Sequence, residues 1–276
     1  MKGSSKIIIY DDGCPLCAAY TSAFVVTGLI NERGRKNFNN IDASIFQWID
    51  KDKCHNEIPL IDLETKEVWY GVDAILELLS TKIPFIKSIG NNIPVKYCLQ
   101  KMYKFISYNR KVIVATSAKN GYDCSPDFNV RYRLYFLAFF LCFNTWMLEP
   151  LFETVFSNSI IKNSSLSQIH WAHFILVSCN ITVAASLGVK KGLEYAGQVN
   201  MLALTCVLLL VPLHIVNINS NFVSAGMNNF YLGLVCLMAV KEYIRRMKYV
   251  SVISLNPGIV CINIISVLFF IFYLLY

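Results

Sequence analysis

The chain has 276 residues, of which 55% are hydrophobic, and its mean hydropathy is +0.47. These values exclude an ordinary soluble protein. The net charge is +7, yet 18 of the 25 Lys and Arg residues and 14 of the 18 Asp and Glu residues fall in residues 1–133. The first half is therefore expected to be a soluble domain and the second half to lie in a membrane.

The first predicted element is a strand at the apolar residues 7–9, and the sequence Cys14-Pro15-Leu16-Cys17 follows at the predicted start of a helix. On the first helical turn, the positive end of the helix dipole and unpaired N–H groups favour the thiolate of Cys14. Pro15 suits this turn because its φ is already helical and its missing N–H is not needed there. Because only two residues separate the cysteines, the pair predicts a redox dithiol with Cys14 as the nucleophile and Cys17 as the resolving thiol.

Metal binding is the main alternative for this cysteine pair, since zinc and soft-metal sites use the same spacing. A structural zinc usually needs four ligands, and the nearest other candidates, Cys54 and His55, are adjacent in sequence and poorly placed to converge on one ion. Redox chemistry without a metal or another cofactor is therefore favoured. A non-enzymatic membrane module that binds metal or senses redox state stays open, as does a regulatory role for Cys54.

Three separated motifs resemble the DCC family of thiol-disulfide oxidoreductases: Asp11-x-x-Cys14-x-x-Cys17, Gly71-Val72-Asp73-Ala74-Ile75, and the stretch from Tyr103 to Arg110. The resemblance covers residues 6–116 and implies a thioredoxin-like α/β fold, with Cys14 and Cys17 as the redox pair and Asp11 as the acid of the motif. Many members carry Gly directly after that Asp, whereas this chain has Asp12 there and Gly13 next. Two carboxylates near Cys14 oppose thiolate formation.

The rest of the N-terminal domain, residues 1–116, is expected to alternate helices and strands. Apolar spacing predicts a helix at 18–29, a second strand and turn within 38–45 with a helix entry at 41–44, a hairpin of 58–63 with 67–70, and a helix at 73–79. Residues 84–94 are expected to form a loop. The resemblance further implies that Pro59 is a cis-proline that faces the dithiol and helps to align an extended substrate backbone.

Residues 95–115 form a basic amphipathic stretch. Its pattern suits a helix that lies on an anionic membrane leaflet or docks on a transmembrane bundle. Asn109 and Arg110 allow a second interpretation, a structural bridge back to the dithiol domain. A nucleic-acid partner is not expected, because the basic residues are few.

A polar linker at 117–131 is expected to precede an all-α transmembrane domain at 132–276. Its apolar stretches are long enough to cross a bilayer as about five helices, at residues 132–148, 169–188, 197–216, 222–240 and 258–276.

Basic residues cluster before the first span and in alternate loops, so the positive-inside rule places the N-terminal domain in the cytoplasm and the C-terminus outside. No export signal is expected at residues 1–10. His170, His173 and His214 are weaker candidates for a ligand site near the outer face.

These patterns together predict a multi-pass cell-membrane enzyme, a thiol-disulfide oxidoreductase with a protein or small-molecule thiol or disulfide as its partner. A reducing cytosol favours the dithiol as the resting form and reduction of the partner. Another alternative makes the membrane domain the functional half, regulated by the dithiol.

Overall fold

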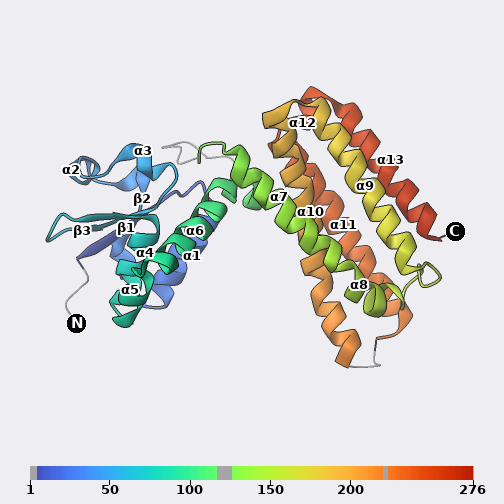
Figure 1. Ribbon diagram of the computed structural model, residues 1–276, viewed down its shortest axis with the longest axis horizontal. Helices are drawn as coiled ribbons and strands as arrows, with labels where there is room; N and C mark the ends of the chain where they lie inside the picture. Colours follow the sequence, from blue (N-terminus) through green and yellow to red (C-terminus); the bar gives the residue numbers. More distant parts are fainter. Residues whose placement is uncertain (1–4, 117–125, 220–222, 276) are drawn as a thin grey trace. The chain divides into compact units, whose positions relative to one another are not determined.

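The chain folds as two compact units, Met1–Tyr132 and Arg133–Tyr276, here called the N-terminal and the C-terminal unit. The computed structural model describes residues 5–116, 126–219 and 223–275 (Figure 1). Of the predicted linker, residues 117–125 lie outside the described residues, as do Cys124, Phe222 and Tyr276. Residues 126–129 form neither helix nor strand, and α7 (Val130–Trp146) begins directly after them.

A four-stranded mixed sheet forms the centre of the N-terminal unit, in the order β2 (Arg35–Asn37), β1 (Lys6–Tyr10), β3 (Pro59–Asp62), β4 (Val68–Tyr70). β1 is parallel to β2 and antiparallel to β3, and β3 is antiparallel to β4. The chain thus makes a β-α-β crossover through α1 (Pro15–Val26), and later a hairpin that leads into α4 (Gly71–Ser80). The hairpin and both helices were predicted close to their observed bounds.

The second strand was predicted in the wrong place. It occupies Arg35–Asn37, whereas Phe38–Asn40 forms the short helix η2. The helix entry predicted at 41–44 is confirmed, because α2 (Ala43–Phe46) begins there with Asp42 at its N-cap. The strand is polar and only three residues long, so it has no apolar alternation by which to find it. The predicted loop at 84–94 is also wrong in part, because Phe85–Gly90 forms α5.

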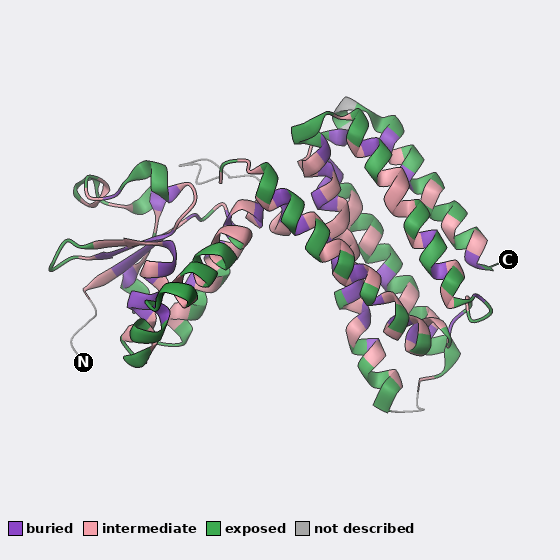
Figure 2. Cartoon of the chain, viewed as in Figure 1, coloured by how far each residue is buried: buried purple, intermediate pink, exposed green. Residues whose placement is uncertain are grey.

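Both faces of the sheet are buried. Side chains alternate along a strand, so Ile7 and Ile9 join one core cluster with Phe38 and Cys54, on the side of α2 and α3 (Lys51–Cys54). Ile8 between them joins the opposite cluster with Leu60 and residues of α1 and α4. Figure 2 shows these strands as one of the most buried parts of the N-terminal unit.

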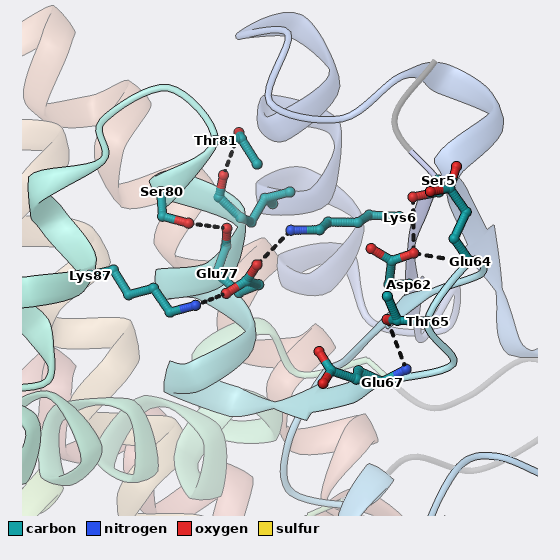
Figure 3. A network of polar contacts seen from close by, with 11 residues as sticks. Ser5, Lys6, Asp62, Glu64, Thr65, Glu67, Glu77, Ser80, Thr81 and Lys87 are labelled. Carbon is teal, nitrogen blue, oxygen red and sulfur yellow. Dashed lines mark hydrogen bonds and ion pairs between the residues drawn. The ribbon is translucent and has the colours of Figure 1, made fainter. Parts of the chain in front are cut away.

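A polar network secures the edge of this core (Figure 3). Glu77 of α4 is 9% exposed and lies 2.6 Å from Lys6 Nζ of β1 and 2.5 Å from Lys87 Nζ of α5. Burial by itself raises the pKa of Glu77, but the hydrogen bonds and charges of the two lysines outweigh it and lower that pKa below the ordinary value. The carboxylate therefore stays ionised at neutral pH and joins three elements of the unit.

All the regular secondary structure among the described residues of the C-terminal unit is helical. Four helical stretches are long and apolar enough to cross a membrane: Val130–Phe156, which joins α7, α8 and η3, then α9 (Leu166–Ser186), α10 (Val189–Asn219) and α13 (Pro257–Leu275). Their apolar outer surfaces indicate a lipid bilayer environment.

The fourth predicted span differs from this group. Its described residues belong to α11 (Ala225–Tyr249), which carries Asn228 and Asn229 near its start and Lys241 and Glu242 in its second half. These polar groups keep α11 outside the set of apolar spans, so the described residues provide four such helices where the sequence predicts five. The short helix α12 (Val252–Leu255) connects α11 to α13.

Candidate functional site

The dithiol lies where β1 ends and α1 begins. A tight turn joins the two elements, because Asp11 Oδ1 accepts a hydrogen bond from the Gly13 N–H at 2.9 Å and the Asp11 carbonyl accepts one from the Cys14 N–H at 3.2 Å. Asp11 is 9% exposed, so its side chain is a buried part of the turn. The predicted acid of the motif therefore shapes the loop that presents Cys14.

Cys14 occupies the N-cap of α1, and Pro15 is the first helical residue, as the sequence predicts. The Cys14 Sγ accepts a hydrogen bond from the Cys17 N–H at 3.4 Å, in the way that a Ser or Asp side chain caps a helix. Both thiols are free, and they are 8% and 3% exposed, respectively. Both thiols are therefore buried, and Cys17, one helical turn further along, is the more buried of the two.

This geometry shifts the pKa values of the two thiols in opposite directions. The hydrogen bond from the Cys17 thiol lowers the pKa of Cys14 to about 6, helped by the Cys17 backbone N–H and the charge of Arg110 and opposed by burial and Asp11. The same sulfur–sulfur hydrogen bond, together with burial, raises the pKa of Cys17. At neutral pH Cys14 is therefore mainly a thiolate, while Cys17 holds a proton.

The Asp12 carboxylate binds two asparagine side chains. It is exposed and accepts hydrogen bonds from Asn39 Nδ2 at 3.1 Å and from Asn37 Nδ2 at 3.4 Å. Asp12 thus ties the turn to the end of β2 and to η2.

One face of α6 (Ile93–Val114) closes the site from the other side. The Tyr103 hydroxyl accepts from the Ile58 N–H at 2.9 Å, and the Ser107 hydroxyl donates to the Asn56 carbonyl at 2.5 Å. Arg110 Nη2 donates to the His55 carbonyl at 2.9 Å, while its Nη1 lies 3.5 Å from Cys17 Sγ. The predicted bridge from Asn109 and Arg110 to the dithiol domain is therefore present, and Arg110 makes it.

Pro59 does not have the predicted conformation. The described residues contain no cis peptide bond, so Pro59 is trans, and it is simply the first residue of β3. The residue before it is already fully hydrogen-bonded, because the Ile58 N–H donates to Tyr103 and the Ile58 carbonyl accepts from the Gly71 N–H at 3.0 Å. A substrate backbone that paired with Ile58 would therefore compete with these two hydrogen bonds.

Cys54 belongs to the core. It is 3% exposed among Ile7, Ile49 and Phe38, and burial raises its pKa to about 12. Among the described residues, no three His, Cys, Asp or Glu side chains gather as a metal site.

Two of the histidines in the C-terminal unit are engaged by threonines. His173 Nε2 lies 3.0 Å from the Thr145 hydroxyl, and His214 Nδ1 lies 2.7 Å from the Thr154 hydroxyl. Each of these ring nitrogens already has a hydrogen-bond partner within the helical bundle.

The sequence pattern did not identify Tyr103 and Ser107 as part of the site. The spacing of residues 103, 107 and 110 does indicate that they share one face of a helix. The sequence does not indicate that this face contacts residues 55–58.

Comparisons with protein-family models, with curated proteins and with solved structures found no match to this chain.

Proposed function

We propose that the protein is a membrane-anchored thiol-disulfide oxidoreductase of the DCC type, with Cys14 and Cys17 as its redox pair. The observation that carries this proposal is the placement of Cys14 Sγ at the N-cap of α1, within hydrogen-bond distance of the Cys17 N–H and with its pKa lowered to about 6. A thiolate at neutral pH with a second thiol one turn away is what disulfide exchange needs.

The architecture of the N-terminal unit supports a thioredoxin-like fold. A β-α-β crossover is followed by a β-β-α element on the same mixed sheet, and the dithiol follows the first strand. The trans Pro59 is a difference from the expected pattern. The resemblance of the three sequence motifs supports the same assignment.

The proposed reaction has two steps. The Cys14 thiolate attacks one sulfur of a partner disulfide, a Cys14–partner bond forms, and the other partner sulfur leaves as a thiolate. Cys17 then loses its proton and attacks Cys14 Sγ, so that a Cys14–Cys17 disulfide forms and the second partner sulfur leaves with the bonding electrons. The partner gains two electrons and the dithiol loses two.

The proposed compartment follows from the basic residues. Arg131, Lys190, Lys191 and the cluster from Lys241 to Lys248 favour the cytoplasmic side for the N-terminal unit, where the resting form is the dithiol. With α11 as a fifth span, the C-terminus is outside. A membrane-impermeant thiol reagent applied to intact cells tests this orientation, since labelling of Cys14 from outside contradicts it.

Trapping of the mixed disulfide tests the activity. In the full-length protein, Cys17→Ser is expected to accumulate disulfide adducts at Cys14, because the resolving thiol is missing, whereas Cys14→Ser forms none at position 17. Peptide mass spectrometry under non-reducing conditions identifies the modified cysteine. Cys54→Ser is the matched control, because Cys54 is buried in the core away from this chemistry. Equal trapping by both variants contradicts the assigned roles, and no trapping in either contradicts exchange and favours a redox-sensing or metal-binding module.

A further inference from the structure

Arg110 reaches the deeper sulfur of the dithiol from a helix that is remote in sequence. Its Nη1 lies 3.5 Å from Cys17 Sγ, although 93 residues separate the two. The guanidinium is half-buried, and its Nη2 is fixed by the His55 carbonyl at 2.9 Å. Because the backbone holds Nη2, the guanidinium is oriented with Nη1 toward Cys17 Sγ.

The helix that carries Arg110 is itself fastened to the same segment. Tyr103 and Ser107 of α6 bind Ile58 and Asn56, which closely follow His55, the residue that Arg110 binds. Three successive turns of α6 thus bind residues 55–58, and the turn that carries Arg110 also contacts the dithiol. The position of the positive charge is therefore set by the fold of the unit.

The environment of Cys17 changes when Cys14 reacts. In the free dithiol, the hydrogen bond to Cys14 is the main cause that keeps the proton on Cys17. Once Cys14 Sγ is part of a mixed disulfide, it carries no charge and that cause disappears. Of the charged and titratable groups that act on Cys17, namely Cys14, Tyr20, Tyr103 and Arg110, the arginine is the cation.

We infer that Arg110 is the positioning residue for the resolving step: it stabilises the Cys17 thiolate and holds it ready to attack Cys14 Sγ in the mixed disulfide. This inference rests on the proposed exchange activity and assigns a role to a residue outside the Cys-x-x-Cys motif. In the step, the Cys17 proton passes to solvent, the Cys17–Cys14 bond forms, and the partner sulfur leaves as a thiolate. An arginine suits this task because it keeps its charge at every relevant pH and can donate two hydrogen bonds in a fixed geometry.

The test measures both steps in the reduced full-length protein in detergent. The probe is 2-hydroxyethyl disulfide, which is uncharged, so that Arg110 cannot act by attracting it. Acid quenching and peptide mass spectrometry follow two species, the Cys14 mixed disulfide and the Cys14–Cys17 disulfide, from pH 5 to pH 10.

Arg110→Gln is expected to accumulate the Cys14 mixed disulfide and to form the internal disulfide roughly tenfold more slowly at pH 7, the change in thiolate fraction that one pKa unit produces. Its rate profile for the second step is expected to move to higher pH. Arg110→Lys is expected to recover part of the rate, because it keeps the charge. A loss that is the same at every pH, or no loss at all, overturns the inference.

Arg35→Gln is the matched control. Arg35 also binds the cysteine-bearing helix, through the Thr21 hydroxyl at 3.0 Å and the Ala18 carbonyl at 3.1 Å, but these contacts are not to a sulfur atom. Its second step is expected to follow the wild-type pH profile. A shift as large as that of Arg110→Gln shows that anchoring of α1, and not the charge beside Cys17, sets the rate.

The wild-type protein separates a failure of this inference from a failure of the proposed function. If wild-type Cys14 forms neither species, the proposed function fails instead, so the two failures are distinguishable.

Discussion

The two units place polar and apolar side chains in opposite positions. The N-terminal unit buries Ile8, Ile9 and Leu60 and leaves most of its charged groups at the surface. The C-terminal unit exposes large apolar side chains on its helices, such as Phe230, Leu237, Phe269 and Phe272, and buries Asn144, Asn228, Asn263 and Gln198. Figure 2 shows this exposure along the helices of the C-terminal unit.

The buried amides show how the helices of the C-terminal unit hold together. Asn263 of α13 donates to the Tyr195 hydroxyl of α10 at 2.6 Å and to the Tyr243 hydroxyl of α11 at 2.8 Å, and the Tyr195 hydroxyl donates to Asn180 Oδ1 of α9 at 2.6 Å. Since lipid tails are as apolar as leucine, burial of apolar surface gives little drive for helices to associate in a bilayer. The comparison teaches that one chain uses water exclusion in one unit and interhelical hydrogen bonds and packing in the other.

The largest effect is expected when the same leucine truncation is made in both units. Leu60→Ala removes a fully buried side chain and is expected to lower the free energy of unfolding of the N-terminal unit by about 2–5 kcal/mol. Leu268→Ala truncates a side chain of the apolar helix α13 that is 60% exposed and is expected to leave stability nearly unchanged. Denaturant unfolding of the full-length protein in detergent measures both, and equal losses contradict the comparison.

A smaller effect is expected for thiol reactivity, because the buried thiol of the N-terminal unit is expected to react faster than an exposed thiol of the C-terminal unit. Cys14 is buried but has a pKa of about 6, whereas Cys261 is exposed on the apolar helix α13. Because the pKa is lowered, the thiolate is present above pH 6 and is lost as the pH falls through that value.

The expected rate of Cys14 alkylation by iodoacetamide therefore rises to a plateau with its midpoint near pH 6. At pH 6 it is expected to exceed that of an ordinary exposed thiol on the order of tenfold, since the lower nucleophilicity of an acidic thiolate removes part of the gain. Cys261, on an apolar helix, is expected to stay unlabelled in lipid bilayers. A Cys14 midpoint near pH 9 disagrees with the N-cap geometry.

The smallest effect is expected for the polar contacts within the C-terminal unit. Asn263→Leu removes two interhelical hydrogen bonds, each of which is expected to contribute roughly 0.6 kcal/mol in a bilayer. Ser266→Ala is the matched control on the same helix, because the Ser266 hydroxyl donates only within α13, to the Ile262 carbonyl. Thermal unfolding in detergent measures the stability of both variants. If Ser266→Ala destabilises the protein as much as Asn263→Leu does, the interhelical hydrogen bonds of Asn263 do not contribute to stability.

Local sequence signals account for the parts of the site that lie within one helical turn. Cys14, Pro15 and Cys17 were placed at a helix start from sequence alone, because N-cap geometry and the φ of proline are properties of the chain itself. The amphipathic helix at 95–115 and most of the membrane-spanning helices were found for the same reason, since length and periodicity need no knowledge of the neighbours. The polar strand β2 and helix α5 were missed because nothing in their local pattern distinguishes them from loop.

Which distant groups meet at the dithiol depends on the tertiary structure. The packing of α6 brings Arg110 to Cys17 and the Tyr103 hydroxyl to the Ile58 N–H. Local patterns were enough to predict a dithiol at a helix start and a largely apolar second half. The acidity of the two sulfur atoms depends on charges and burial from other elements, and such long-range contacts are set by how the helices pack and not by any local pattern of residues.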